Sequence, residues 1–460
     1  MADDPTPDDL EEPGADAPEP PPEPPPEPPL DPPQSPLLVL REGLPPLTET
    51  EPALAEACAA ITAGTGPVAI DAERASGYRY SNRAYLIQLR REGSGTWLID
   101  PIAFESLAPL SAALEGTDWI LHAATQDLPC LADIGLFPGS LFDSELAGRL
   151  LGYPRVGLAT LVETVLGQRM KKEHSAVDWS TRPLPAPWLE YAALDVEVLV
   201  ELWEALSAQL VEAGKDEWAR QEFAHLLNFE ATPRVDAWRR TSGMHRVRGR
   251  RGLGAVKALW ETRDEIAERR DVTPGRIIPD SAIVAAAQAM PETREQLLAV
   301  KGFHGRGADR YAPRWVAALN AVAALDESEL PTRAPRSDGP PLPRAWAERD
   351  PVAARRLVIA REALTQLAEQ LQLPVENLLT PDYLRRVLWT PPATRDPDSL
   401  AAEVAGQLAG LGARPWQIEL TGPVITDAIL EGDKPAVVAE PVAELLADDP
   451  EPDPEADPEP

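Results

Sequence analysis

The residues of this sequence that could carry out chemistry are carboxylates, and the first pair closes an apolar stretch. GPVAID (66–71) follows a Gly-Pro turn and ends in Asp71-Ala72-Glu73. Alternation along a strand puts residues 71 and 73 on the same side. Two adjacent carboxylates repel each other unless a partner such as a hard divalent cation compensates their charge. A lone Asp-x-Glu is more often a solvated strand end, so further residues must support a metal site.

A third carboxylate, Asp127, follows a strand-like stretch at 118–123 and falls in the first turn of the next predicted helix. Aspartate in that position also caps a helix and complements its dipole, so a structural role and a metal-binding role both stay open. His122 lies at the end of the same stretch. It could be a ligand, although a histidine after a buried strand is more often structural.

A fourth carboxylate, Asp195, lies four residues after Tyr191 in a predicted helix. This spacing places the phenol and the carboxylate on one helix face. Asp195 stands in an apolar stretch, where an unpaired charge is costly, so it needs a partner. Tyr191 taken alone could equally be a core aromatic residue.

The joint occurrence of these residues is more informative than any one of them. Four carboxylates that converge are what two divalent ions need when they lie about 4 Å apart for phosphoryl displacement. A tyrosine one turn before the last carboxylate could orient the attacking water. The set is Asp71, Glu73, Asp127, Tyr191 and Asp195.

Strands followed by helices must position these side chains. The segments 83–91 and 95–100 are strand-like and are joined by the turn EGSG, so they predict a hairpin. Together with 66–71 and 118–123 they make three or four strands. A helical pattern then covers 184–210. This order predicts an α/β or α+β domain.

The order and spacing of these motifs resemble the DEDD superfamily of 3′–5′ exonucleases in its Tyr-containing branch, and more narrowly the ribonuclease D family. The resemblance rests on 68–89, 119–135, 141–153 and 171–199, the last containing DWSTRPLPAPWLEYAALD. Residues 253–325 resemble the helicase-and-RNase-D C-terminal (HRDC) domain, and 345–430 resemble a second, more divergent copy.

The resemblance implies a fold and a site. The fold is α/β, a ribonuclease-H-like mixed sheet with flanking helices, followed by two small all-α HRDC-like modules. Asp71, Glu73, Asp127 and Asp195 would be metal-site carboxylates, and Tyr191 would orient the water. The family usually has an aromatic or apolar residue directly after the glutamate, whereas this chain has Arg74. The way in which the family packs the 3′-terminal nucleobase of its substrate therefore does not transfer to this chain.

Charge is distributed unevenly along the 460 residues. The formal net charge is −32, but residues 1–36 hold eleven acids and no base, and residues 440–460 hold nine acids and no base. The global charge therefore does not exclude a nucleic-acid partner. Two cysteines without metal-type spacing disfavour a zinc site or a disulfide framework. The start lacks a signal peptide, and no apolar run is long enough to cross a bilayer, so we expect a cytoplasmic protein without membrane contact.

Composition and helical patterns divide the chain into five predicted parts. Residues 231–330 carry 17 bases against 13 acids, and clustered bases can neutralise phosphates. The candidates for nucleic-acid binding are Arg248, Arg250, Arg251, Lys301, Arg306 and Arg310. The predicted parts are an acidic Pro-rich disordered tail (1–38), the 3′–5′ exonuclease domain (39–230), the HRDC domain (245–326), the second HRDC-like domain (340–432) and a disordered acidic tail (433–460).

These observations predict a metal-dependent 3′–5′ exoribonuclease that trims the 3′ ends of structured RNA such as tRNA precursors and releases nucleoside 5′-monophosphates. All-oxygen ligands favour two Mg²⁺ or Mn²⁺ ions. Two alternatives stay open. One is a 3′–5′ exonuclease that acts on DNA, because the pocket around the 2′-hydroxyl decides sugar preference. The other is an inactive RNA-binding scaffold protein.

Overall fold

A computed structural model describes residues 35–171, 176–230, 235–332 and 339–435. The two acidic tails lie almost entirely outside this range. The described chain begins inside the segment expected as a tail. Leu38 is buried, and its amide donates a hydrogen bond to the carbonyl of Arg169, while the amide of Arg169 donates to Pro36.

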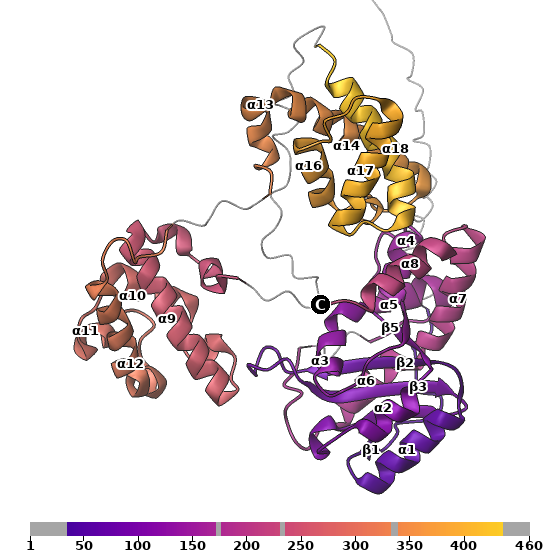
Figure 1. The fold of residues 1–460 in the computed structure, drawn as a ribbon. Coiled ribbons are helices and arrows are strands. Elements are labelled where there is room, and N and C mark those ends of the chain that lie inside the picture. The colour runs from indigo at the N-terminus through magenta and orange to yellow at the C-terminus, as the bar shows by residue number, and fades with distance from the viewer. Residues whose placement is uncertain (1–34, 172–175, 231–234, 333–338, 436–460) are drawn as a thin grey trace, which may run out of the picture. The chain divides into compact units, whose positions relative to one another are not determined.

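The first domain is built on one mixed sheet of six strands with helices around it (Figure 1). The strand order is β1-β4-β3-β2-β5-β6, in which β2 pairs antiparallel with β3 and parallel with β5. The carboxylate-bearing strand β2 is therefore interior. The strands are β1 (Leu47–Thr48), β2 (Thr65–Arg74), β3 (Ala84–Glu92), β4 (Gly95–Ile99), β5 (Asp118–Leu121) and β6 (Ser140–Asp143).

The predicted hairpin and the first and fourth predicted strands are confirmed. β3 and β4 pair antiparallel, and β2 and β5 cover the expected stretches. Two strands were not expected, namely β1 and β6. They are two and four residues long, too short to show a periodic pattern in the sequence.

Helices flank this sheet, and the helical pattern over 184–210 is confirmed. It forms two helices with a break at Val198 (φ −111°, ψ −3°). The break follows Glu197, a buried carboxylate that pairs with Arg90 and Arg41. The helices are α1 (Glu51–Ala63), α2 (Ala108–Leu114), α3 (Leu128–Ala132), α4 (Ser144–Leu150), α5 (Leu158–Leu161), α6 (Ala186–Glu197), α7 (Leu199–Glu212) and α8 (Asp216–Leu226).

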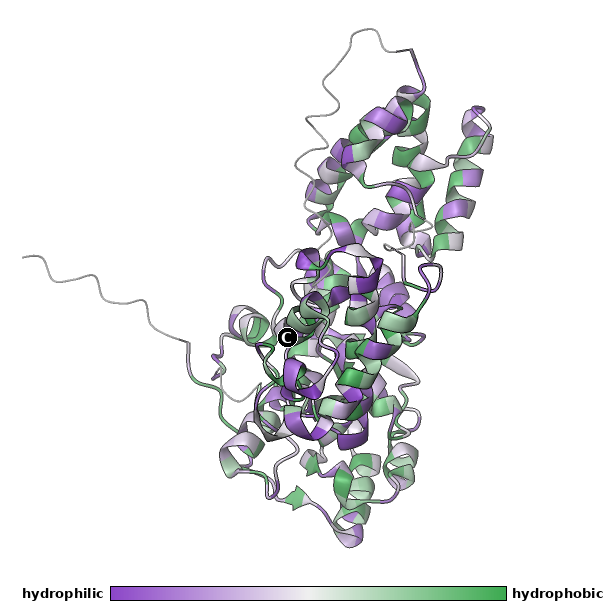
Figure 2. Ribbon diagram, turned by 90° about the vertical axis from the view of Figure 1, so that its left-hand side faces the viewer, coloured by the Kyte–Doolittle hydropathy of each residue, from purple (hydrophilic) through white to green (hydrophobic). Residues whose placement is uncertain are grey.

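The next module is helical and has its own hydrophobic core. Phe303 packs edge-on against Trp315, with ring centroids 6.0 Å apart, and both side chains are fully buried. Hydrophilic and hydrophobic residues both occur along the helices of the chain (Figure 2). The main helices of this module are α9 (Gly249–Arg270), α10 (Asp280–Ala289), α11 (Arg294–Leu298) and α12 (Gly305–Ala324).

Helix α10 begins without a side-chain cap. Pro279 occupies the cap position, and Asp280 is the first helical residue. The Asp280 carboxylate instead accepts hydrogen bonds from Arg263 and from the amide of Ser242. The buried guanidinium of Arg263 needs a counter-ion, which explains why this carboxylate is not free to cap.

The C-terminal helical module shares its core with the first domain, both lying in the compact unit Pro36–Pro460. Trp218 stacks on Trp416 at 4.8 Å, and Glu222 accepts hydrogen bonds from Trp416 and Arg414. Two modules were predicted in tandem, but only the first has a separate core among the described residues. The main C-terminal helices are α14 (Pro351–Leu371), α16 (Pro381–Trp389), α17 (Pro397–Leu411) and α18 (Pro415–Gly432).

Candidate active site

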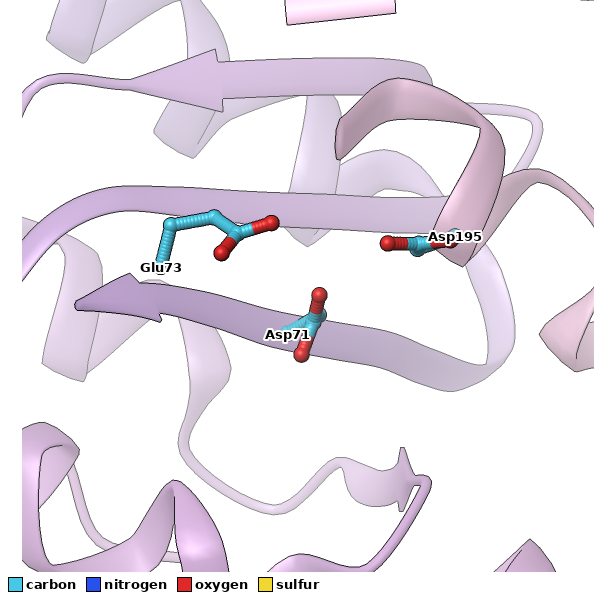
Figure 3. A group of neighbouring side chains, drawn as sticks. All are labelled: Asp71, Glu73 and Asp195. Atoms are coloured by element: carbon cyan, nitrogen blue, oxygen red, sulfur yellow. The ribbon is translucent and has the colours of Figure 1, made fainter. Parts of the chain in front are cut away.

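Strand β2 and helix α6 bring three of the predicted carboxylates together. Asp71 and Glu73 lie in the second half of β2, and Asp195 lies near the end of α6 (Figure 3). One oxygen of each can be chosen so that all three lie within 4.8 Å of one another. Helix α6 packs against the sheet through the buried Ala192 and Ala193, whose small side chains allow a close approach.

The fourth predicted carboxylate, Asp127, reaches the same site from another element. It lies between the 3-10 turn η2 (Ala124–Gln126) and α3, and it is buried. Its side chain makes no capping hydrogen bond to α3, so the capping role does not account for it. It hydrogen-bonds to Asp71 and lies 3.4 Å from a guanidinium nitrogen of Arg74.

The electrostatics of the four carboxyl groups fit a cation site. Burial raises the pKa of Asp71, and it raises the pKa of Glu73, Asp127 and Asp195 well above the usual range. The negative charges of neighbouring carboxylates raise the pKa of the last three further. Arg74 lowers the pKa of Asp71, Glu73 and Asp127, but does not reverse the shift. Converging carboxylates that are buried or half-buried and offer only oxygen donors suit hard divalent cations, which can replace the protons.

Tyr191 lies one helical turn before Asp195 and faces the same group. Its hydroxyl hydrogen-bonds to Asp195. Burial, and then the charges of Asp195, Glu73 and Asp71, raise the pKa of Tyr191 above its ordinary value. The phenol therefore stays protonated at neutral pH. It can donate a hydrogen bond and orient a water molecule, but it does not act as a base.

Sequence reasoning missed one residue of the site's support, Asp143. This buried carboxylate accepts hydrogen bonds from the amides of Ala123 and Ala124 at 3.1 and 2.9 Å. It also accepts from the amides of Glu145 and Leu146 in α4. Ala123 has φ +57°, a left-handed conformation that costs a non-glycine residue about 1 kcal/mol. Asp143 thus holds the turn that carries Asp127, and an acidic residue after the short apolar run LF was its signal in the sequence.

His122 has a structural role in this turn. Its Nδ1 lies 2.9 Å from the hydroxyl of Ser144, which also donates to the carbonyl of Leu121. Burial lowers the pKa of His122 to about 4, so the ring is neutral at physiological pH. It is not among the described residues that gather at the carboxylate group.

The basic residues predicted to bind nucleic acid fall into two groups. Arg250 donates to the carbonyls of Leu330 and Pro331, and Arg251 donates to three carbonyls at the end of α12. These two guanidiniums are occupied inside the module. Arg248, Lys301 and Arg310 are exposed, whereas the side chain of Arg306 lies outside the described part of the chain.

Comparison with known proteins agrees with this geometry. A family model described as a 3′–5′ exonuclease matches residues 47–211, an HRDC domain matches 252–319, and a 3′ to 5′ exonuclease C-terminal domain matches 339–429. A protein of Acidiphilium cryptum called ribonuclease D is 33% identical over 347 residues, which are 71% of this chain and 87% of that protein. The chain belongs to the ribonuclease D family. It is accordingly a 3′–5′ exoribonuclease, and its exonuclease fold implies the use of a divalent metal.

Solved structures extend the likeness to the ribonuclease D fold as a whole. A crystal structure of a protein from Bifidobacterium adolescentis matches with a TM-score of 0.78 and 37% identity, over 86% of this chain and all of that one. Ribonuclease D of Escherichia coli matches with a TM-score of 0.61 and 24% identity, over 84% of this chain and 98% of that one. Among the described helices, none is both long and apolar enough to span a membrane.

Proposed function

We propose that this chain trims the 3′ ends of structured RNA, tRNA precursors among them, and that Asp71, Glu73, Asp127 and Asp195 hold two Mg²⁺ or Mn²⁺ ions. The observation that carries the proposal is the convergence of these carboxylates from β2, α6 and the turn after β5, two of them half-buried and two buried. Within the group, Asp71 lies next to Asp127 and within 4.8 Å of Glu73 and Asp195, so it would be the carboxylate best placed to serve both ions.

The side chains of this site divide the work of hydrolysis. Divalent cations, when bound by these carboxylates, would supply a polarised attacking water and would stabilise the leaving oxygen. Tyr191, protonated and fixed one turn from Asp195, orients that water for attack on the terminal phosphodiester. The products are a nucleoside 5′-monophosphate and an RNA shortened by one nucleotide.

Structured RNA is proposed as the substrate class for two reasons. The E. coli relative is described as an exoribonuclease involved in structured RNA processing. The region 231–330 of this chain carries a net positive charge, with Arg248, Lys301 and Arg310 exposed on it. An RNA with a folded body can contact such a module while its 3′ end occupies the active site, and each neutralised phosphate adds affinity.

A matched pair of oligonucleotides tests this function. Purified protein is given RNA and DNA of the same sequence, each with a free or a phosphate-blocked 3′ end, with Mg²⁺, Mn²⁺ or EDTA. We expect stepwise release of 5′-monophosphates from the free RNA end and no release in EDTA. A tRNA with a 3′ extension should be shortened to its folded body. Hydrolysis of DNA at an equal or higher rate would favour the DNA exonuclease alternative instead.

The alternative of an inactive scaffold is not supported. All five residues of the predicted nuclease motif are present and near one another, and the family to which the chain belongs consists of exoribonucleases.

A further inference from the structure

We propose that Arg74 is a positioning residue that binds a backbone phosphate at the 3′ end of the RNA, next to the carboxylate site. The inference rests on the proposed function, because it assigns a role in holding the same substrate. It concerns a residue that directly follows Glu73 in the sequence and that is not a metal ligand.

A register shift in the sheet brings Arg74 to the site. The pairing of β2 with β3 is regular from Val68 to Glu73, and it shifts between Glu73 and Arg74. Simple alternation would point Arg74 to the side of the sheet opposite Asp71 and Glu73. Such irregularities re-aim side chains at the ends of strands. Here the guanidinium reaches the turn after β5, where it meets Asp127 and Gln126.

The contacts of Arg74 leave most of its donors available. Nη2 lies 3.4 Å from Asp127 Oδ1 and 3.4 Å from Gln126 Oε1, and both distances are long for this kind of contact. Within the described residues no contact is recorded for Nε or Nη1. The side chain is 27% exposed, so solvent or a ligand can reach it. A guanidinium offers five N–H donors in a planar fork that matches two phosphate oxygens.

Charge explains why this arginine would turn to phosphate during function. Without a cation, the guanidinium of Arg74 lies 3.4 Å from Asp127 and turns its positive charge to that carboxylate. Four carboxylates and two divalent cations sum to zero charge. The cations would then compensate the negative charge of Asp127, so the guanidinium of Arg74 could pair with a phosphate. A metal-loaded site thus presents a positive group to the substrate.

A rival account is that Arg74 only neutralises Asp127. Binding measurements separate the two accounts without relying on turnover. The variants are Arg74→Ala, Arg74→Lys and, should the alanine variant fold poorly, Arg74→Gln. The control is Arg220→Ala, which removes a 67% exposed arginine paired with Glu217 on α8. Binding of a labelled RNA oligonucleotide is measured by anisotropy with Ca²⁺ in place of Mg²⁺, and a gel verifies that the RNA stays intact.

The decisive probe is an oligonucleotide with one neutral methylphosphonate at the terminal or at the penultimate linkage. We expect Arg74→Ala to weaken binding of the unmodified RNA about 10- to 100-fold, as the loss of a charge-assisted hydrogen bond does. At one of the two linkages, the methylphosphonate should weaken binding to the wild type and leave binding to Arg74→Ala unchanged. Arg74→Lys should fall in between, and Arg220→Ala should match the wild type.

Two results would overturn the proposal. One is binding of unmodified RNA by Arg74→Ala within about twofold of the wild type. The other is an equal methylphosphonate penalty in both proteins at both linkages. Failure of the proposed function looks different, because the wild-type protein itself would then not degrade RNA in Mg²⁺.

Discussion

At the scale of single residues, the site consists of four carboxyl groups that lie close together, two of them buried and two half-buried. Asp71 occupies its centre, since it hydrogen-bonds to Asp127 and lies within 4.8 Å of Glu73 and Asp195. Each of the four carboxyl groups has a raised pKa because burial disfavours its charged form. In the metal-free protein, the burial of these groups thus costs free energy of folding, and bound cations would remove that cost.

Replacing Asp71 by asparagine should abolish hydrolysis while the protein remains folded. We expect a rate below about a hundredth of wild type, because several kcal/mol of transition-state stabilisation would depend on the cations that Asp71 is proposed to hold. In EDTA the variant should melt at the same temperature as the wild type or higher, since one buried charge is removed. The rise in melting temperature on adding Mg²⁺ should disappear. The control is Glu115→Gln, which changes an exposed acid and should keep the wild-type rate. Retention of a tenth of the wild-type rate by Asp71→Asn would contradict a two-metal site.

Tyr191→Phe separates a water-orienting role from a packing role. The change keeps the ring and deletes the hydroxyl that contacts Asp195. We expect the rate to fall roughly 10- to 1000-fold with a nearly constant melting temperature. Tyr153→Phe is the matched control, because its hydroxyl bonds to Gln209 in the same domain and away from the carboxylates. An unchanged rate with a lowered melting temperature would make Tyr191 a core residue.

At the scale of elements, the turn between β5 and α3 is the part that needs most support. Ala123 in this turn has a left-handed backbone conformation, and the turn places Asp127 at the site. Asp143 at the end of β6 accepts hydrogen bonds from four backbone amides, two in this turn and two in α4. One carboxylate therefore fixes the turn to the neighbouring strand and to the helix that follows.

Asp143→Asn should weaken metal binding without touching a metal ligand. The new amide group must direct N–H donors at backbone amides that already donate, which leaves buried groups unsatisfied at about 1–3 kcal/mol. We expect a lower melting temperature and an activity that higher Mg²⁺ concentrations partly restore. A calorimetric Mg²⁺ titration measures the affinity directly. The control is Asp118→Asn, which changes a surface carboxylate that accepts a hydrogen bond from Ser140 at the opposite end of the same strand pair. Unchanged Mg²⁺ affinity would limit Asp143 to general stability.

His122 makes a separate, pH-dependent contribution at the same turn. Its pKa is lowered to about 4 by burial, whereas an unfolded histidine titrates near about 6.5. The unfolded chain therefore binds one more proton than the folded one between these values, so stability increases with pH from about 4 to about 6.5. His122→Gln should reduce this slope by up to about one proton in urea unfolding at a series of pH values. An identical slope in the variant would show that the ring does not stay neutral in the fold.

At the scale of the whole molecule, function depends on where charge is placed. The formal net charge of −32 would repel RNA, yet residues 231–330 carry more bases than acids. Not all of these bases are available. Arg250 and Arg251 hold carbonyls inside the module, whereas Arg248, Lys301 and Arg310 are exposed.

The triple variant Arg248→Ala, Lys301→Ala and Arg310→Ala should weaken binding of a tRNA-sized RNA. If all three contact phosphates, the slope of log affinity against log salt should fall by about 3 in magnitude. Turnover of a saturating short oligonucleotide should be unchanged, because the carboxylates lie in the first domain. Arg250→Ala should instead lower the melting temperature of the module. An unaltered salt slope in the triple variant would mean that these side chains do not contact phosphate.

Local patterns in the sequence predict the chemistry-bearing residues and the order of the main elements. The Asp-x-Glu pair, the Tyr-x-x-x-Asp pair and the β3–β4 hairpin are local patterns, and local spacing decides them. The long helices of the later modules have strong amphipathic patterns, so they were predictable for the same reason.

The residues that support the site become apparent only from contacts between segments that are distant in the sequence. Asp143 and Asp127 are 16 positions apart, and the parallel pairing of β5 with β6 brings their turns together. The register shift that turns Arg74 towards Asp127 depends on the partner strand β3. Likewise, the guanidinium of Arg251 donates a hydrogen bond to a backbone carbonyl of α12, which is distant from it in the sequence. Such contacts join segments that are distant in sequence, and no periodicity within one segment encodes them.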